Sequence, residues 1–539
     1  MASGDLFQVE VELKRVQTFI FQVPRLKAML GANALVGETV RHELSKIACQ
    51  HAVGVTSQQL LEADAHDPFQ PTASVPATPV LDADDPAALY KRGILVRDGG
   101  RFKAVFEGYG PASAFAKAAG ALLVKSLPGV LFRVDCSPLG KGRDEIDSTA
   151  RPAQATEVHI LDLPVFQVCE ESGSDVASHK GRKGKWAGAW VGVLESAADR
   201  FKSGETRDLI GGGMRKPLRL EETQWVAPDD LETMCGPEYL ALIHADGNGV
   251  GKRYSEWRKK CAKDASEIDR EAWGERFFYS MRVAVRKALV EALNKTFEPD
   301  ARIRVRPFAV LMLGGDDLLL ACRASDAPAF ALNYARAMKP HILADGKPLD
   351  VAIGVAIAKP SYPFHRLHEL AEALAGSAKR LYRSDPALGS VIDWQVVTAS
   401  WFDDVAGVRR RSELVRYRVG TKNETCVLTE RPYAVLGQDR TLESLMVASE
   451  ELKSLETEAD EAPGRTAFRS LRSAFERGRL SATMAFERLP EEVRSRLAGS
   501  GADTPWRELR DGVWSTRVLD VIGLQELRHL GGKNHDENV

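Results

Sequence analysis

Two adjacent carboxylates interrupt an apolar stretch of the chain. Asp316 and Asp317 follow Gly314 and Gly315, and apolar runs lie on both sides of these four residues. Glycines adopt the positive φ angles of tight hairpins, and short apolar runs are typical of buried strands. Adjacent carboxylates repel each other unless a cation or hydrogen bonds compensate, and their hard oxygen ligands suit Mg²⁺ or Mn²⁺. The pattern predicts a metal site at the tip of a β-hairpin; the alternative is a solvated turn.

A second carboxylate motif precedes this one. Residues 239–246 read as a buried strand that ends in Asp246. The loop after it is rich in glycine, and we expect its backbone N–H groups to bind phosphate oxygens. The nucleotide-binding residues predicted in this loop are Gly247, Asn248, Gly249 and Gly251, with Gly314 and Gly315 added from the hairpin.

The elements between and after these motifs predict how the carboxylates meet. Apolar spacing predicts, in order, a strand at 239–246, a helix at 272–297, strands at 308–313 and 318–322, a helix at 327–344, a strand at 349–358, a helix at 365–383 and a strand at 390–397. This order is a βαββαβ core with additions. In that topology, the first strand and the hairpin end side by side at the centre of the sheet. We therefore predict that Asp246, Asp316 and Asp317 hold one or two divalent ions.

Three carboxylates on divalent ions indicate chemistry on phosphates. Two metal ions can activate a hydroxyl and neutralise a leaving pyrophosphate, so nucleotidyl transfer is the natural inference. Lys379 lies on the predicted helix 365–383, where its ammonium is expected to reach a triphosphate. The alternative for this residue is an ordinary exposed lysine.

The chain resembles the large, polymerase-like subunit of type III CRISPR effector complexes. The matching motifs are residues 244–251, 314–317 and the helix with Ala378 and Lys379. The resemblance implies a palm domain at 237–399 that makes cyclic oligoadenylates from ATP with Mg²⁺ or Mn²⁺. The family often has a second acid where this chain has Asn248. Diguanylate cyclases share the palm core, but Leu318 stands where they have phenylalanine, which disfavours guanine.

The N-terminal region is similar to the family's degenerate first palm. Residues 1–139 give a second βαββαβ pattern, in which the hairpin retains one acid, Asp98. Packed against the second palm, this domain would hold two nucleotides between the palms. Asn33 stands where the family usually has serine, so we expect it either to bind a ribose or phosphate or to stabilise its loop.

The remaining regions are predicted from composition. Residues 140–236 read as a linker or small module between the palms without an intact zinc site, because Cys169 stands alone and the seven cysteines include no Cys-x-x-Cys. Residues 400–539 have helical spacings without a strand pattern, which predicts a C-terminal helical domain. The predicted fold class is α+β, with two ferredoxin-like (βαββαβ) palm domains and this helical domain.

The sequence also bears on partners and location. Lys and Arg number 73 against 75 acids, so the chain is not broadly basic, although the basic and aromatic segment 179–190 reads as either an RNA contact or a solvated linker. The His-Asp pairs at His66 and His535 read as surface residues, so we expect no HD nuclease and no DNA cleavage. Without a secretion signal or an apolar run of about 20 residues, the protein is expected to be cytoplasmic and off the membrane.

Three functions remain open at this point. The first is an ATP-using nucleotidyltransferase that makes a cyclic or linear oligoadenylate signal in antiviral defence, with RNA and effector subunits as partners. The second is an RNA-binding scaffold subunit with weak catalysis, which Asn248 favours. The third is a standalone cyclase that makes a cyclic dinucleotide.

Overall fold

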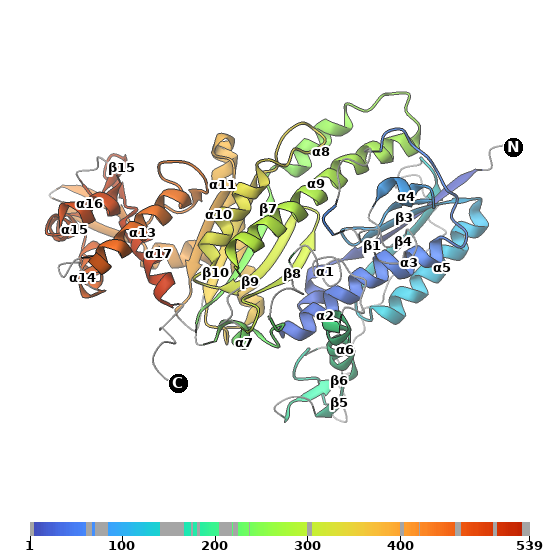
Figure 1. Cartoon of the computed structure of the whole chain (residues 1–539), viewed down its shortest axis with the longest axis horizontal. Helices are drawn as coiled ribbons and strands as arrows, with labels where there is room; N and C mark the ends of the chain where they lie inside the picture. The colour runs from blue at the N-terminus through green and yellow to red at the C-terminus, as the bar shows by residue number, and fades with distance from the viewer. Residues whose placement is uncertain are drawn as a thin grey trace.

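The computed structural model describes most of the chain. The described residues are 5–60, 67–69, 85–140, 167–173, 176–180, 184–203, 218, 225–236, 238–298, 304–398, 404–419, 421–458, 465–499 and 504–530. Three regions follow one another along the long axis, from the N-terminal sheet through a central sheet to a C-terminal region of helices and short strands (Figure 1). The architecture is mixed α and β, as the sequence predicts.

The N-terminal region is built on a four-stranded sheet. Its strands are β1 (Leu6–Lys14), β2 (Ile94–Val96), β3 (Arg101–Glu107) and β4 (Leu131–Pro138). Their order is β2-β3-β1-β4, and every neighbouring pair is antiparallel. The helices of this region are α1 (Val16–Ile20), α2 (Leu26–Gly37), the π-helical η1 (Glu38–Glu43), α3 (Leu44–Ala48), α4 (Pro86–Tyr90) and α5 (Tyr109–Ser126).

The central region carries a six-stranded sheet. Its strands are β7 (Leu240–Gly247), β8 (Phe308–Gly314), β9 (Asp317–Arg323), β10 (Val351–Ala358), β11 (Val391–Val396) and β14 (Tyr433–Ala434), in the order β14-β11-β10-β7-β9-β8. Only β10 and β11 pair in parallel among these strands. In both sheets, the first strand lies between the second strand of the hairpin and the strand that follows the next helix.

Helices cover both faces of the central sheet. On one face lie α9 (Glu267–Thr296) and α10 (Ala327–Met338), packed against alternate side chains such as Ile243 and Leu320. On the other face lie α7 (Leu231–Cys235), α11 (Phe364–Ser384) and the first turns of α2, packed against Leu242 and Leu319. Burial on both faces explains why these strands are apolar at nearly every position.

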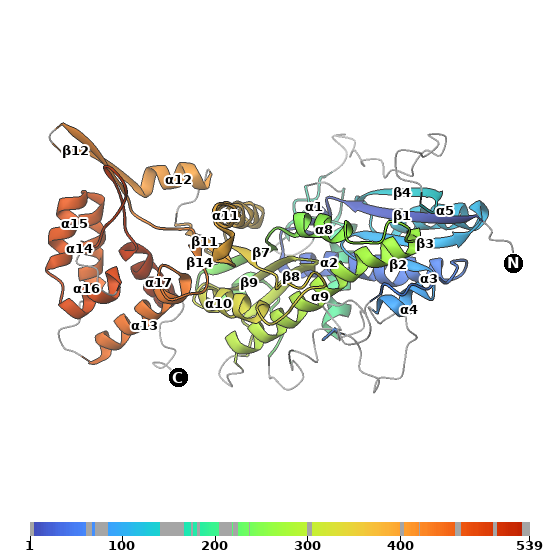
Figure 2. The same ribbon diagram turned by 90° about the horizontal axis from the view of Figure 1, so that it is seen from above.

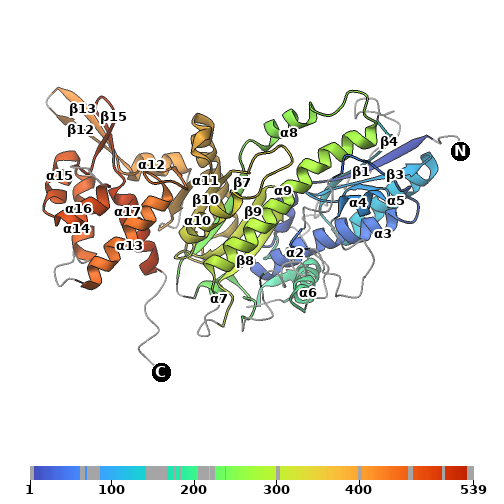
Figure 3. The same ribbon diagram turned by 45° about the horizontal axis from the view of Figure 1, so that its top comes forward.

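Helix α9 connects the two sheets. Ala272, near its N-terminus, belongs to a small apolar cluster with Leu95 and Val105 of the N-terminal sheet. Residues further along the same helix, such as Phe277 and Leu289, lie in the main core of the central region. Figure 3 shows this long helix running from the central region to the N-terminal one. The shared helix fixes the two sheets relative to each other.

The segment between the two sheets is small in its described part. Strands β5 (Ala177–Lys180) and β6 (Trp186–Gly188) form a two-stranded sheet, and α6 (Ala189–Ser203) packs on α2. The ammonium of Lys180 lies 5.3 Å from the centroid of the Trp186 ring. Residues 181–183 of the basic segment 179–190 lie outside the described residues.

The C-terminal region is not purely helical, so the prediction of a helical domain at 400–539 is wrong in this respect. Its helices are α12 (Val405–Ser412), α13 (Leu442–Glu458), α14 (Arg465–Glu476), α15 (Arg479–Glu487), α16 (Glu491–Ala498) and α17 (Val518–Leu530). A four-stranded sheet, in the order β12-β13-β16-β15, accompanies them; its strands are β12 (Leu414–Val419), β13 (Lys422–Val427), β15 (Arg507–Arg510) and β16 (Val513–Ser515). Figure 2 shows β12 extending away from these helices.

No helix in the described ranges combines the length and the apolar character that a membrane span requires. The two remaining short helices are α8 (Val250–Arg258), after the glycine-rich loop, and the 3-10 helix η5 (Pro386–Leu388).

Candidate functional site

Three carboxylates lie at one end of the central sheet. Asp246 is the penultimate residue of β7, and Asp317 is the first residue of β9. These strands pair antiparallel, with Ala245 opposite Leu318, so Asp246 and Asp317 follow that pair at the same end. Asp316 lies in the turn between β8 and β9, which the pair Gly314 and Asp317 closes. The three side chains that we predicted as metal ligands are thus brought together.

The hairpin turn needs a residue in the left-handed region. Gly315 has φ of 59°, whereas the neighbouring Gly314 does not have a positive φ. With Gly315 and Asp316 as its two central residues, the turn carries Asp316 out of the apolar strands and toward β7.

Gly247 lets the carboxylate of Asp316 approach the backbone of β7. A Cβ atom at position 247 would lie 2.8 Å from Cβ and from Oδ2 of Asp316, and 2.7 Å from Cγ2 of Val250. Only a residue without a side chain leaves room for Asp316 there. The role of Gly247 in the structure is therefore to admit a carboxylate beside Asp246.

Lys379 reaches the same place from α11. Its ammonium forms an ion pair and a hydrogen bond with Oδ2 of Asp246, and both side chains are about three-quarters buried. The lysine therefore neutralises part of the negative charge of the three carboxylates. The role predicted for Lys379, contact with a triphosphate, requires its ammonium to lie close to these carboxylates.

Burial and mutual repulsion make the hairpin carboxylates weak acids. Burial, and after it the charge of Asp246, raise the pKa of Asp316 to about 6. Burial, followed by the charges of Asp246 and Asp316, raises the pKa of Asp317 to about 7. A divalent cation would relieve this repulsion, and oxygen donors at such close range fit Mg²⁺ or Mn²⁺.

The glycine-rich loop turns directly into α8. Gly249, with φ of 68°, precedes the first residue of the helix, and Gly251 is exposed. The backbone N–H of Asn248 donates to the carbonyl of Asp350, so this amide is already used within the protein. The side chain of Asn248 is 2% exposed, and its Oδ1 and Nδ2 have no hydrogen-bond partner among the described residues.

A cavity of about 240 Å³ lies between the two sheets, beside the hairpin. Gly314, Asp317 and Met312 line it on the central side, and α1, α2, η1 and the β2–β3 turn line it on the other. Asn33 also lines the cavity, and its Nδ2 donates to the carbonyl of Leu311 on β8 at 3.0 Å. Asn33 thus ties α2 to the hairpin strand, and its predicted contact with a nucleotide stays a prediction.

Two arginines in the cavity wall were missed by the sequence reasoning. Arg41 from η1 and Arg97 from the β2–β3 turn line the cavity that Asp317 lines from the other side. Arg97 Nη1 donates to the carbonyl of Arg41 at 3.1 Å. The sequence does not indicate that these two arginines belong to the cavity wall, because only the packing of the two sheets brings them opposite the hairpin.

Asp98, the single acid of the N-terminal hairpin, lies among arginines. It forms ion pairs with Arg41 at 3.0 Å, Arg282 at 3.1 Å and Arg286 at 3.6 Å. The last two arginines belong to α9. This carboxylate therefore joins the N-terminal hairpin to the helix shared by both sheets.

Asp67 corrects another expectation. We read the His66-Asp67 pair as surface residues, but Asp67 is fully buried and forms an ion pair and a hydrogen bond with Arg286. The expectation is wrong because a carboxylate in a polar segment can be buried when it forms an ion pair with an arginine from another part of the chain. His66 and the pair at His535 lie outside the described residues.

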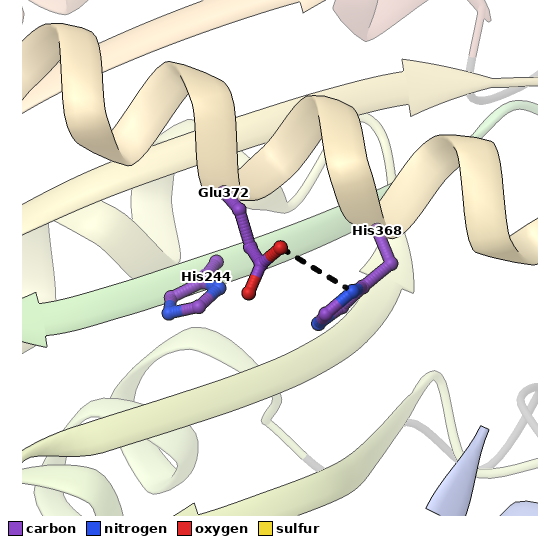
Figure 4. A group of neighbouring side chains, drawn as sticks. All are labelled: His244, His368 and Glu372. Atoms are coloured by element: carbon purple, nitrogen blue, oxygen red, sulfur yellow. Dashed lines mark ion pairs between the residues drawn. The ribbon is translucent and has the colours of Figure 1, made fainter. Parts of the chain in front are cut away.

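A second group of potential metal ligands was also missed. His244, two residues before Asp246 on β7, lies near His368 and Glu372 of α11 (Figure 4). Burial lowers the pKa of His244, and burial with the neighbouring His244 lowers the pKa of His368 to about 4, so both rings are neutral near pH 7. The helical spacing of His368 and Glu372 was visible in the sequence, but the pairing of this helix with β7 was needed to interpret it.

Comparisons with known proteins identify structural neighbours only. No protein-family model matches the chain, and no curated protein sequence does. The crystal structure of a Csm1-Csm4 cassette in complex with cA3 matches with a TM-score of 0.48 and 10% identity, over 99% of this chain and 70% of that one. Csm1 from T. onnurineus matches with a TM-score of 0.43 and 12% identity, over 98% of this chain and 69% of that one.

A third match is shorter. A Csm1-Csm4 cassette with AMPPNP aligns with a TM-score of 0.37 and 11% identity, over 70% of this chain and 54% of that one, so the chain spans about half the length of that protein. All three matching structures contain Csm1.

Proposed function

We propose that this protein is a metal-dependent nucleotidyltransferase that converts ATP into a cyclic or linear oligoadenylate, as a subunit of the type III CRISPR kind. The observation that carries the proposal is the meeting of Asp246, Asp316 and Asp317 at one end of a rigid sheet, with Lys379 in contact. Both faces of that sheet are covered by helices, so the donors are held by buried elements.

The chemistry follows from the charge of the site. Bound Mg²⁺ or Mn²⁺ would supply charge neutralisation at the phosphates and an acidified hydroxyl. Asp246, Asp316 and Asp317 are the residues that would hold the ion. The ammonium of Lys379, now on Asp246, would turn to a triphosphate oxygen when a cation takes over its carboxylate partner.

The two sheets are proposed to be a pair of palm domains. Their common strand arrangement supports the βαββαβ domains proposed at 1–139 and 237–399, and the cavity between them lies beside Asp317. We propose that ATP binds there, between the hairpin and the wall that carries Asn33, Arg41 and Arg97. Gly247, Asn248, Gly249 and Gly251 remain proposed contacts of the phosphates.

The first experiment is an assay of the protein alone. The purified chain is incubated with each labelled nucleoside triphosphate and with Mg²⁺ or Mn²⁺, and the products are resolved by chromatography and mass spectrometry. A cyclic adenylate identifies an autonomous synthase. If products form only after effector subunits and target RNA are added, the chain is a regulated subunit, and if none form in either assay the proposal is wrong.

The matching variant removes the hairpin carboxylates. Asp316→Ala with Asp317→Ala is expected to reduce product by at least about a thousandfold, because the metal loses two of its three ligands. The control is Glu491→Ala with Glu492→Ala, which removes two adjacent exposed acids from α16, far from the site. Unchanged turnover in the first double variant, with the fold intact by circular dichroism, would refute the assignment.

A second function is favoured by one residue. Asn248 stands where a second acid would add a metal ligand, and its side-chain amide has no partner among the described residues. A scaffold subunit with little catalysis would tolerate this. Replacing Asn248 by Asp separates the two functions, because it should increase activity only in a chain that already holds the metal.

A further inference from the structure

Three side chains face one another between β7 and α11, beside the aspartate site, and one of them, His244, also lies close to Asp246 and Asp317. They are His244, His368 and Glu372, and Figure 4 shows the carboxylate of Glu372 between the two imidazole rings. One ligand atom of each residue lies within 4.8 Å of those of the other two. Nδ1 of His368 is 3.8 Å from Oε2 of Glu372, which is too long for a hydrogen bond.

The local structure explains why these side chains converge. His368 and Glu372 are four residues apart on α11, so they lie on one face of the helix. That helix packs across β7, which presents His244 to it. Two neighbouring donors on a helix and a third on the opposing element are a common way to build a metal site.

The two imidazoles are buried without their hydrogen bonds. The side chains of His244 and His368 are 7% and 10% exposed. Nδ1 of His244 and Nε2 of His368 have no partner among the described residues. Burying a polar atom without a partner is unfavourable, so a structure that does so twice in one place calls for a ligand.

The neighbouring residues do not provide hydrogen-bond partners for all of the nitrogens of the two rings. Nε2 of His244 lies 4.0 Å from Oδ1 of Asp317, which leaves Nδ1 for another partner. The ring of Phe21 packs against His368 with centroids 4.7 Å apart, which explains its burial but provides no partner for its nitrogens. Glu372 is 42% exposed, so an ion has a path to the three donors from solvent.

We propose that His244, His368 and Glu372 bind a divalent transition-metal ion of the Zn²⁺ class, at a site that adjoins the aspartates, because His244 also lies close to Asp246 and Asp317. Two imidazoles and one carboxylate are a donor set that Zn²⁺ accepts, with water as a fourth ligand. Donors of a tetrahedral zinc ion lie about 3.4 Å apart, so small side-chain rotations complete the site. Mg²⁺ prefers oxygen donors, and this preference keeps the two sites distinct.

The site goes beyond the proposed catalysis, but it has a consequence for it. The ion would join α11 to β7 two helical turns before Lys379. It would also orient the imidazole of His244. The other nitrogen of that ring faces Asp317, whose carboxylate would be an outer-shell partner of the ion.

Direct metal binding tests the proposal without nucleotide turnover. The metal-free full-length protein is titrated with Co²⁺, whose visible spectrum reports tetrahedral coordination, and Zn²⁺ is then added to displace it. We expect one Co²⁺ per chain that is lost or weakened more than about a hundredfold in both His368→Gln and Glu372→Gln, because removing an outer-shell partner alone costs about 10–100-fold. The matched control, Glu369→Gln on the exposed side of the same helix, should bind like the wild type.

A second comparison separates this site from the aspartates. Asp316→Asn with Asp317→Asn should retain the tetrahedral Co²⁺ spectrum even if it loses all synthesis. Unchanged Co²⁺ binding in the folded Glu372→Gln and His368→Gln variants overturns the proposal. Loss of the spectrum in the aspartate variant, or no tetrahedral Co²⁺ in the wild type, overturns it as well.

Discussion

The positions and charges of the side chains in the aspartate site depend on their immediate neighbours. Asp316 lies beside β7 because Gly247 has no side chain, and Asp246 is partly neutralised because α11 brings Lys379 to it. Each of these residues can be changed singly, and each change has a defined physical result.

Substitution of Gly247 by Ala should displace Asp316. The new methyl group would lie 2.8 Å from Cβ of Asp316, so the carboxylate must move and the affinity for Mn²⁺ should fall at least about tenfold. Such overpacking typically costs about 1–3 kcal/mol. Mn²⁺ binding by electron paramagnetic resonance measures the effect. Gly251→Ala is the matched control, because apart from its chain neighbours and the backbone of its own helix nothing lies within 4 Å of the methyl group there. Equal losses in both variants would contradict the reasoning.

Asp317→Asn should stabilise the metal-free protein at alkaline pH. Because the pKa of Asp317 in the fold, about 7, is higher than in the unfolded chain, the native state binds more protons between about pH 4 and 7, and its stability falls as the pH rises through this window. Asparagine removes this loss. Since Asp317 is 39% exposed, solvent screening limits the gain to about 1 kcal/mol, or about 2–4 °C.

Thermal denaturation at two pH values measures this. The gain should be present at pH 8 and shrink toward pH 4. Added Mg²⁺ should raise the melting temperature of the wild type more than that of the variant. A variant that melts below the metal-free wild type at pH 8 would show that Asp317 is not electrostatically crowded.

The sequence predicts some site residues and not others for physical reasons. Asp246, Asp316 and Asp317 end apolar runs, and a charge at the end of a buried strand is visible without a structure. Arg41, His368 and Asp67 have no such local signature. Their roles depend on which distant element packs against them, which residue spacing within one element does not encode.

Secondary-structure elements were predictable where one pattern dominates. The apolar strands β7, β8 and β9 and the amphipathic helix α11 are bounded as expected to within a few residues. The hairpin of β12 and β13 was missed, although Val415, Tyr417 and Val419 alternate with arginines in the period of a strand. Arginines at the alternate positions, Arg416 and Arg418, reduce the apolar signal by which such a strand is recognised.

Helix α8 is held in place by one arginine. Nε and Nη2 of Arg253 donate to the carboxylate of Asp345 at 2.8 and 2.6 Å, and Nη1 donates to the carbonyl of Pro348 at 2.8 Å. These bonds fix the helix that follows the glycine-rich loop to the segment before β10. The position of that loop therefore depends on an ion pair outside the site.

Asp345→Asn should loosen α8 locally. Breaking a buried pair costs about 3 kcal/mol, which equals about a hundredfold loss of hydrogen-exchange protection in α8. Burial by itself would raise the pKa of Asp345, but the hydrogen bonds and charge of Arg253 lower it overall. The stabilisation by this ion pair is therefore complete above about pH 4 and is lost as the pH falls further. The exposed Asp264→Asn is the control, and equal protection in both variants would contradict this role.

At the scale of the whole molecule, polar contacts join the two sheets beside the cavity. Asp98 of the N-terminal hairpin pairs with Arg282 and Arg286 of α9, and Asn33 of α2 donates to Leu311 of β8. The apolar clusters on α9 and α2 complete the contact. The relative position of the sheets depends on both kinds of interaction.

Asp98→Asn should weaken this junction. Three arginines would lose their shared carboxylate, at a cost of about 3–5 kcal/mol for a buried network. Hydrogen exchange should increase in β2, β3 and the first half of α9. Asp135→Asn, which breaks the more exposed pair with Arg133, should cost less than about 1 kcal/mol, and an equally small effect of Asp98→Asn would refute the role of the network.

The volume of the cavity between the sheets has a mechanical consequence. At about 240 Å³ it is smaller than the roughly 300–1,000 Å³ of pockets that enclose small ligands. A nucleotide bound there would therefore either extend past the lining residues or move the sheets apart. Movement apart would stretch the Asn33 and Asp98 contacts and consume part of the binding free energy, so ligand affinity and the separation of the sheets would be linked.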